Sequence, residues 1–471
     1  MSMYSPYRRG FGYYLKRIIF VSVLLALGFY APDIMTYYNR LDSEKILAAS
    51  TFKNKTFSTP VQEIKSSGMT AYLLEEHSVP IVSIDFKFGN AGVAHEDEEK
   101  QGLVRILSSL LIDGAGKYDA EAFKDTCEEY GIKIGFDYDN DDFSGYLYAP
   151  RKNLPKALEM LTAVLQKPRF DKEFMTLRKE QLKTAIKSKM ENPEAVLAEK
   201  FSGFIFAGHP YSRKAMTVLK TLDNVSEDDL LKFMQTHLSR ENLIISFAGD
   251  LTKKDVKDIL KSPFAELPEK YAGEKMNRIE LKLGGREKNV KYKSAQAISF
   301  FATNGTYREA EDYYPLYLAN YIFGGSGLNS RISQIIREKE GLTYGIATYL
   351  QQNDAVALLT GSYSSTPDNF RKAQNLLLEQ WQKMAQEGIS DKELQQTKES
   401  LISSFNLRFA SISGIASMLT GMQQYNLGRD FLEKRNDYIK AVTLDEVNAA
   451  AKKYFGTKPD FVNIDVKNKG E

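Results

Sequence analysis

The histidines of this 471-residue sequence are too widely spaced to form a helical metal site. They are His77, His95, His209 and His237, and no two of them lie three or four residues apart. A zinc-binding helix of the common type places two ligands on one face, at positions i and i+4. We therefore expect all four to be solvated or capping residues, with His209 setting the turn at Pro210.

Other reactive groups are also poorly placed for catalysis. Cys127 is the only cysteine, which excludes an intrachain disulfide and a cysteine-based metal site. The neighbouring Glu128 and Glu129 raise rather than lower the pKa of a thiol, so an activated nucleophile is not expected. The acidic run 137–142 lacks the residue order of an EF-hand and is interpreted as a solvated hairpin turn. Trp381, the only tryptophan, is expected to pack from a helix.

A guanidinium and a phenol seven residues apart offer a different chemistry. They are Arg337 and Tyr344, within the segment 330–344. A guanidinium presents a fork of donors to a carbonyl or carboxylate, and a phenol can donate to an oxyanion. Gly341 is expected to end a helix and Tyr344 to open a strand, so that both side chains can face one cleft. In the alternative, Arg337 pairs with a nearby glutamate on a solvated helix and Tyr344 packs within a sheet.

A glycine-rich segment lies just upstream and contains Gly324, Gly325 and Gly327. Glycine-rich loops can surround phosphates, but this one lacks the lysine that follows the last glycine of a P-loop. We expect a mobile or close-packed loop rather than a nucleotide site.

Hydrophobic periodicity predicts a mixed α+β fold. Alternating or short apolar runs bounded by glycine predict strands, and longer amphipathic runs predict helices. The predicted strands are 70–74, 81–88, 146–149 and 243–250, with one strand on each side of 137–142. The predicted helices are 98–112, 120–130, 154–166 and 171–190.

Three short sequence matches recur in the same order and indicate an internal duplication with units of about 215 residues. The matched segments are 130–132 with 344–346, 171–174 with 391–394, and 225–230 with 442–447, at offsets of 214, 220 and 217. Each unit is expected to be a sheet packed against helices. We assign 60–265 to the first repeat, 266–290 to a linker and 291–471 to the second repeat.

The amino-terminal residues have the composition of a targeting segment. Residues 1–32 contain no acid, and four basic residues precede an apolar run at 18–31. This pattern is typical of a signal peptide or an uncleaved signal anchor, followed by a tether at 33–59. We expect an exported protein, periplasmic or anchored in the inner membrane, with a mitochondrial presequence as the alternative.

The overall composition is that of a globular chain with two or more domains. Hydrophobic residues make up 43% and charged residues 26%, and the formal net charge is +2. Because acids and bases are interspersed, a nucleic-acid partner is not expected.

The segment 102–114 resembles the metal-binding helix of the insulinase or pitrilysin peptidases, the inverzincins. In that family the helix carries H-x-x-E-H, whose two histidines bind zinc and whose glutamate is the general base. The corresponding residues here are Arg105, Ser108 and Ser109. The segment 191–193 resembles the end of the family's second metal segment, which puts the distal ligand position at Ala185. An arginine is a permanent cation and does not bind zinc, so all three ligands and the base are missing.

The resemblance covers roughly residues 60–465 and includes Gly208-His209-Pro210-Tyr211. It implies α+β domains that pair around a chamber for an unfolded peptide. It also implies that Arg337 and Tyr344 belong to the family's arginine–tyrosine segment, which holds the substrate backbone and the developing oxyanion. Gly324, Gly325 and Gly327 correspond to its glycine-rich loop.

The leading hypothesis is a peptidase-family subunit that is inactive alone. It would bind no cofactor and would pair as a heterodimer with a homologous subunit that holds zinc and hydrolyses peptides or unfolded proteins. The alternative is a non-catalytic scaffold or core subunit of a membrane-associated complex. Independent metallopeptidase activity is not expected, because the ligands are missing.

Overall fold

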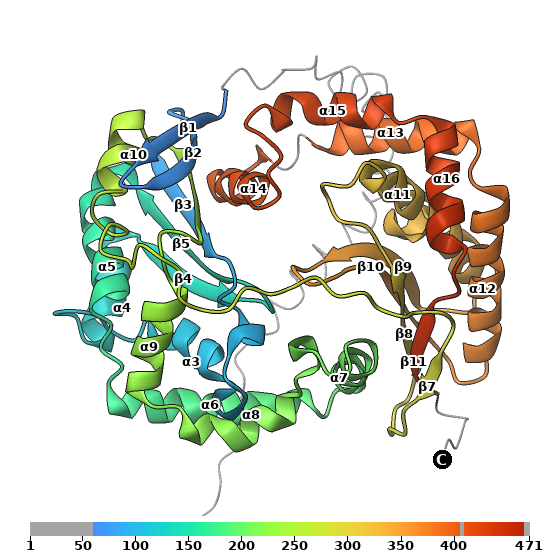
Figure 1. The fold of residues 1–471 in the computed structure, drawn as a ribbon, viewed down its shortest axis with the longest axis horizontal. Helices are drawn as coiled ribbons and strands as arrows, with labels where there is room; N and C mark the ends of the chain where they lie inside the picture. The colour runs from blue at the N-terminus through green and yellow to red at the C-terminus, as the bar shows by residue number, and fades with distance from the viewer. Residues whose placement is uncertain (1–59, 406–408, 466–471) are drawn as a thin grey trace, which may run out of the picture. The chain divides into compact units, whose positions relative to one another are not determined.

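The computed structural model of the chain describes residues 60–405 and 409–465 (Figure 1). The predicted signal segment 1–32 and the whole of the tether 33–59 lie outside the described residues. Within the described ranges, no helix combines the length and apolar character needed to span a bilayer.

The first sheet has the strand order β1-β2-β6-β3-β5-β4. Neighbouring strands are antiparallel, except for the parallel pair β2 and β6. Side chains alternate between the two faces of a strand, so the alternating apolar residues of β3 place Val82, Ile84, Phe86 and Phe88 in the core. The strands are β1 Gln62–Ser66, β2 Met69–Glu75, β3 Ile81–Phe88, β4 Lys133–Tyr138, β5 Phe143–Pro150 and β6 Leu243–Gly249.

The helices of this half confirm the predicted helices at 120–130, 154–166 and 171–190, but the one predicted at 98–112 is wrong at both ends. A 3₁₀ turn at Glu98–Lys100 comes first, and the α-helix begins only at Leu103 because Gly102 has a φ of +101°. The helices are α3 Leu103–Leu110, α4 Ala120–Tyr130, α5 Leu154–Gln166, α6 Lys172–Lys189, α7 Pro193–Ile205, α8 Ala215–Thr221, α9 Glu227–His237 and α10 Lys253–Ile259.

The second sheet has the order β7-β11-β8-β10-β9, with one parallel pair, β7 and β11. This is the order and direction of β2-β6-β3-β5-β4 in the first sheet. The range 266–290, expected to be a linker, contributes the edge strand β7. The strands are β7 Glu287–Asn289, β8 Ala297–Asn304, β9 Gly345–Gln352, β10 Ala357–Ser365 and β11 Asp460–Ile464.

The helices of the second half include two π-helical segments, Tyr321–Gly325 and Ser333–Lys339, and a 3₁₀ turn, Gly327–Asn329. Trp381 packs from α12 as predicted and is 2% exposed. The α-helices are α11 Tyr313–Asn320, α12 Phe370–Glu387, α13 Asp391–Phe405, α14 Ile412–Gln424, α15 Phe431–Ala441 and α16 Leu444–Phe455.

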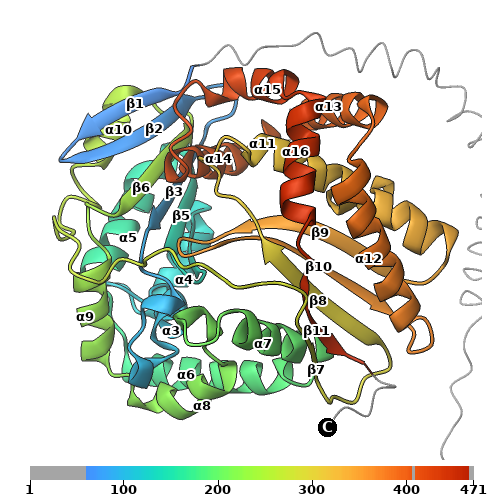
Figure 2. The same cartoon turned by 45° about the vertical axis from the view of Figure 1, so that its right-hand side comes forward.

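Each half gives one helix to the sheet of the other half (Figure 1, Figure 2). Helix α14 contacts β2, β3 and β6 of the first sheet, where Gln423 Nε2 donates to the carbonyl of Ile245 at 2.7 Å. Helix α7 contacts β8 and β11 of the second sheet. Its Leu197, Phe201 and Ile205 belong to one apolar cluster with residues of those strands, among them Ile298, Ala302, Val462 and Ile464.

The acidic turn between β4 and β5 is a second junction. The predicted hairpin turn is confirmed and Asp137 and Asp139 are exposed, but the prediction that the whole run is solvated is wrong for its last two residues. Asp141 and Asp142 are each only 4% exposed. Asp141 accepts hydrogen bonds from the Tyr211 hydroxyl and, at 3.1 Å, from Asn353 Nδ2 in the β9–β10 turn. Asp142 pairs with Lys87 Nζ at 2.7 Å. The carboxylates are buried because partners from distant parts of the chain satisfy them.

The helix exchange predicts that the two halves unfold together. Leu197 of α7 is fully buried against the second sheet, so Leu197→Ala should destabilise the protein by about 2–5 kcal/mol. Trp381, in the second half, should report the lower urea midpoint by its fluorescence. Leu177→Ala, on α6 where Leu177 is 45% exposed, is the matched control and should leave the midpoint nearly unchanged. An unchanged urea midpoint of the Trp381 fluorescence in the Leu197→Ala variant would contradict this coupling.

Candidate functional site

A buried carboxylate fixes the start of α3, the helix that carries three of the four predicted metal-site positions. Glu96 is 5% exposed and accepts hydrogen bonds from the backbone N–H groups of Gly102 at 3.0 Å and Val104 at 2.8 Å. It thereby satisfies two donors that a helix N-terminus leaves open. A side chain at Gly102 would meet Val218 of α8, so only glycine fits this close approach.

The side chains at the three α3 positions are engaged in other contacts. Arg105 Nη1 donates to the Tyr138 hydroxyl at 3.3 Å, and the guanidinium lies 5.3 Å from the centre of that ring. Ser108 and Ser109 each donate to a helix carbonyl three residues back, Arg105 and Ile106 respectively, at 2.9 Å. None of these groups is a zinc ligand, and the serine hydroxyls are not activated by a base.

The fourth position lies on the neighbouring helix α6, which contacts α3. Ala185 is exposed and has no atom that binds metal. A bidentate ion pair holds this helix in place, since Arg178 Nε and Nη2 each lie 2.6 Å from the carboxylate of Asp113, just after α3. No group of three histidine, cysteine, aspartate or glutamate residues is arranged to hold a metal ion in the part of the chain that the structure describes. The residues predicted to occupy the family's zinc positions do not fit the metal.

Tyr344 lies in a solvent-accessible turn that leads into β9, and Arg337 lies in the helix that precedes this turn. Arg337 is in the π-helical segment Ser333–Lys339 and pairs with Glu338 at 3.3 Å, as the alternative interpretation predicted. Tyr344 is 56% exposed, so it does not pack within the sheet. Gly341 follows the helix with a φ of +61°, which confirms the predicted helix end. No hydrogen bond joins Arg337 to Tyr344 among the described residues, although the short turn keeps them close in the chain.

The glycine-rich segment is partly close-packed. A side chain at Gly324 would collide with Thr348 of β9 and Ile332, and one at Gly325 would press on Asn320. Gly327 has a φ of +64° and open space around it. Packing therefore requires glycine at Gly324 and favours it at Gly325, and the backbone conformation favours it at Gly327.

The isolated reactive residues are as unreactive as predicted, but His95 and His237 differ from the prediction for the histidines. The His237 ring stacks on Phe233, and desolvation lowers its pKa. Burial raises the pKa of Cys127 to about 11, so the thiolate is not formed at neutral pH. His209 caps the turn at Pro210 by accepting from the backbone N–H of Tyr211. His95, expected to be solvated or capping, is largely buried, and desolvation lowers its pKa to about 4. Its Nε2 atom is buried without a hydrogen-bond partner.

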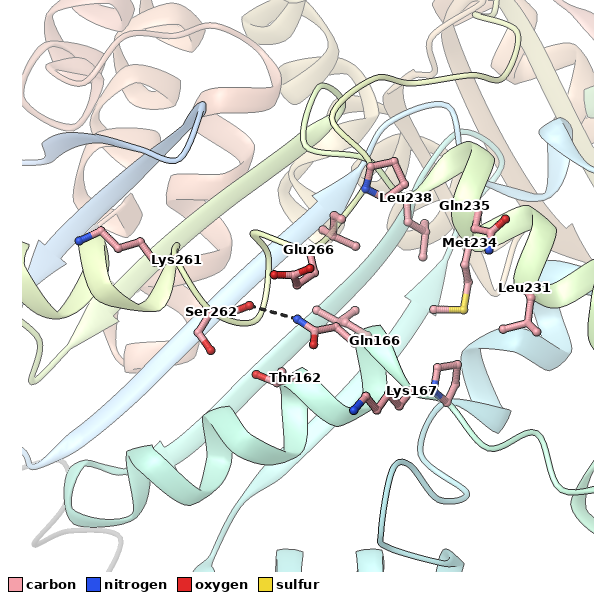
Figure 3. A pocket seen from close by; sticks show the side chains of 14 residues that line it. Thr162, Gln166, Lys167, Leu231, Met234, Gln235, Leu238, Lys261, Ser262 and Glu266 are labelled. Carbon is pink, nitrogen blue, oxygen red and sulfur yellow. Dashed lines mark hydrogen bonds between the residues drawn. The ribbon is translucent and has the colours of Figure 1, made fainter.

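A cavity of about 610 Å³ lies between α5, α9 and the segment after α10 (Figure 3). Its lining combines apolar residues such as Leu231 and Met234 with Gln166, which donates to the Ser262 carbonyl at 3.2 Å. None of the predicted site residues lines it. This cavity is therefore not part of the site built around α3 or around Tyr344.

Two family models match successive parts of the chain. Residues 73–217 match the model for insulinase (peptidase family M16), and residues 224–401 match the model for the peptidase M16 inactive domain. The chain belongs to the insulinase (M16) peptidase family. The first match contains Arg105, Ser108, Ser109 and Ala185, and the second contains both Arg337 and Tyr344.

Similar M16 proteins have names of both kinds, peptidase and non-peptidase. An uncharacterized zinc protease of Rickettsia felis is 25% identical over 284 residues, which are 60% of this chain and 68% of that protein. The non-peptidase homolog YmxG of Helicobacter pylori is 23% identical over 390 residues, which are 82% of this chain and 89% of that protein.

Solved structures share the M16 fold. A peptidase M16 inactive domain from Pseudomonas fluorescens aligns with a TM-score of 0.79 at 23% identity, over 86% of this chain and 97% of that chain. A chain of complex III from Candida albicans aligns with a TM-score of 0.70 at 13% identity, over 87% of this chain and 97% of that chain.

The sequence did not predict two interactions that hold the α3 region in place, the Glu96 helix cap and the Arg178–Asp113 ion pair. Glu96 appears in the sequence as one acid in the run 96–99, and its role depends on folding back onto α3. Arg178 and Asp113 are 65 residues apart, so no local pattern predicts their ion pair. One local pattern could have indicated the role of Glu96 as a helix cap. It is an acid followed by a short turn and then a glycine, directly before an apolar helix.

Restoring the family's ligands should create a zinc site if α3 and α6 are aligned correctly. Combining Arg105→His, Ser108→Glu, Ser109→His and Ala185→Glu should give a protein that retains one zinc ion per chain after dialysis, measured by elemental analysis. Omitting Ala185→Glu should weaken zinc retention, because this glutamate on α6 is the ligand that completes the set begun by the two histidines on α3. A folded quadruple variant with no more zinc than the natural chain would contradict the alignment.

Glu96 should give the stability a pH dependence of known sign. Burial raises its pKa from 4.5 to about 7, so the folded state favours the protonated form and loses that advantage as pH rises through this window. The free energy of unfolding, relative to a Glu96→Gln variant, should fall by about 3 kcal/mol between about pH 4 and pH 8. Urea titrations of both proteins measure this difference, and parallel pH profiles would contradict it.

Proposed function

We propose that this chain is the zinc-free subunit of an insulinase-type peptidase. It pairs with a homologous subunit that holds zinc and the general base, and together they hydrolyse peptides or unfolded proteins. The observation that carries the proposal is the contrast within one chain. All four metal-site positions lack suitable side chains, while the phenol of Tyr344 remains exposed in the other half.

The roles of Arg337 and Tyr344 follow from what their side chains can donate. The Arg337 side chain is 35% exposed and, among the described residues, pairs with Glu338 alone. This is a weak surface pair that a substrate carboxylate or carbonyl can replace. Tyr344 offers a hydroxyl donor at the end of a short turn, where it can reach an oxyanion on a substrate bound by the partner. Gly324 packs closely against Thr348 of β9, and this contact helps to hold the strand that follows Tyr344 in place.

The second candidate function is that of a non-catalytic core subunit. It is favoured by the same loss of metal-site residues and by the structural likeness to a chain of complex III from Candida albicans. In this case the chain binds partners without contributing to hydrolysis, and Arg337 and Tyr344 act only locally.

The matching strand order of the two sheets supports an origin by duplication of one sheet-and-helix unit. We further propose that the protein is exported and is periplasmic or anchored in the inner membrane through residues 1–32, with mitochondrial import as the alternative. The acid-free composition of that segment supports this localisation.

Peptide hydrolysis by a mixture with a zinc-motif homologue from the same organism tests the first proposal. Neither protein alone should hydrolyse the peptide as fast as the mixture does. Tyr344→Phe should lower kcat of the mixture by about 10²-fold, since one oxyanion donor is lost. Arg337→Ala should act mainly by raising KM, because it removes a substrate contact.

Two matched controls separate these effects from general damage. Tyr349→Phe alters a tyrosine on the adjoining strand β9 that is 50% exposed, and Lys339→Ala removes a cation from the same helix as Arg337. Neither should change the rate. A complex whose hydrolysis is indifferent to all four substitutions would overturn the catalytic proposal in favour of the core subunit.

A further inference from the structure

A second cavity, of about 620 Å³, lies between α11, α14 and α15, and none of the predicted site residues lines it. These three helices lie near one another in both views (Figure 1, Figure 2). The α14 residues that line it follow a three- and four-residue spacing and so share one helix face: Gly414, Ser417, Met418, Gly421, Met422 and, just past the helix end, Tyr425. Thr420 and Gln423, by contrast, bond to the first sheet. The cavity therefore uses a part of α14 that the fold does not need for docking.

The lining is aromatic and cationic. Among the described residues, the lining includes Arg308 and Arg435 and no aspartate or glutamate. Six aromatic side chains contribute to it, namely Tyr313, Tyr314, Tyr317, Tyr425, Phe405 and Phe431. Such a surface favours an apolar ligand with negative charge.

Arg308 is the cation that lacks a counter-ion. Its Nη1 donates to the Tyr313 hydroxyl at 2.7 Å, and its Nε is buried without a hydrogen-bond partner. It forms no ion pair within residues 60–405 and 409–465. Its guanidinium carbon lies 4.9, 5.8 and 5.6 Å from the ring centres of Tyr313, Tyr425 and Phe431. These rings stabilise the cation, but most of its five donors have no protein acceptor among the described residues.

Arg435 shows how the fold satisfies an arginine that serves structure. It is 8% exposed, and its Nη1 donates to the Leu401 carbonyl at 2.8 Å and to Asn436 Oδ1 at 3.1 Å. Its guanidinium packs on the Phe405 ring. The two arginines line the same cavity, and the contrast singles out Arg308 as the group available to a ligand.

We propose that this cavity binds a carboxylate attached to a bulky aromatic or branched aliphatic group. The carboxylate pairs with Arg308, which supplies the acceptor that its guanidinium lacks. The apolar body lies beside Met418 and Gly421, where a thioether adapts to ligand shape and no side chain fills the space. The volume falls within the range of about 300–1,000 Å³ that small-molecule sites occupy. This proposal does not depend on the peptidase partnership.

Two sources carry this chemistry, a free apolar acid and the carboxyl-terminal residue of a peptide. Isothermal titration of the full chain with 4-phenylbutyrate and with the peptide Gly-Gly-Leu-Phe distinguishes them. Each probe is compared with its own neutral amide. At least one acid should bind at least about tenfold more tightly than its amide, a difference that one charge-assisted hydrogen bond provides. The acid that binds identifies the source.

Three variants complete the test. Arg308→Gln should remove the preference for the acid, while Arg278→Gln, at a stacked arginine already paired with Glu309, should keep it. Gly421→Leu should abolish binding by filling the cavity. That helical position has open space beyond its Cβ, and leucine favours a helix more than glycine does, so the variant should fold. Failure of both acids to bind, equal binding of acid and amide, or unchanged binding by Gly421→Leu would overturn the proposal.

Discussion

The exchange of helices between the two sheets is the constraint on which the rest of this structure depends. A sheet with two apolar faces needs cover on both, and the second face of each sheet is covered by a helix from the other half. Helix α14 covers the first sheet and α7 covers the second. Neither half can therefore complete its core alone, and every segment that bears on function is held in a frame built by both halves.

The same frame relates the segments that resemble a peptidase site. The β4–β5 turn docks on the β9–β10 turn through Asp141, whose carboxylate accepts from Asn353 and Tyr211. Strand β4 contacts α3, and β9 begins directly after Tyr344. The contacts that join the halves thus also connect the degenerate metal helix to the arginine–tyrosine turn. The fold around α3 is that of the family, while Arg105, Ser108 and Ser109 make hydrogen bonds within the first half.

Sequence periodicity predicted most of the elements near the site, because β3 and β5 alternate and α4 to α6 have clear boundaries. Residue identity alone shows that Arg105, Ser108, Ser109 and Ala185 lack zinc-binding groups, and their correspondence to the family's metal positions stays a prediction. The burial of Asp141 and Asp142 could not be predicted, since a local acidic run is normally solvated and their partners come from distant turns and strands. The start of α3 was missed because a left-handed Gly102 breaks an otherwise continuous helical pattern.

In the proposed complex Tyr344 lies beside a metal held by another chain, and the distance between the two can be measured. Cys127 is the only cysteine, so a Cys127→Ser, Tyr344→Cys chain can carry a single nitroxide at that position. A zinc-motif homologue loaded with paramagnetic Co²⁺ is then added, and nitroxide relaxation is measured. If Tyr344 lies beside the partner's metal, Co²⁺ should strongly enhance relaxation of a nitroxide at position 344. It should not affect a nitroxide placed at position 177 instead of Leu177. A stable complex that leaves the label at position 344 unaffected would contradict this placement of Tyr344.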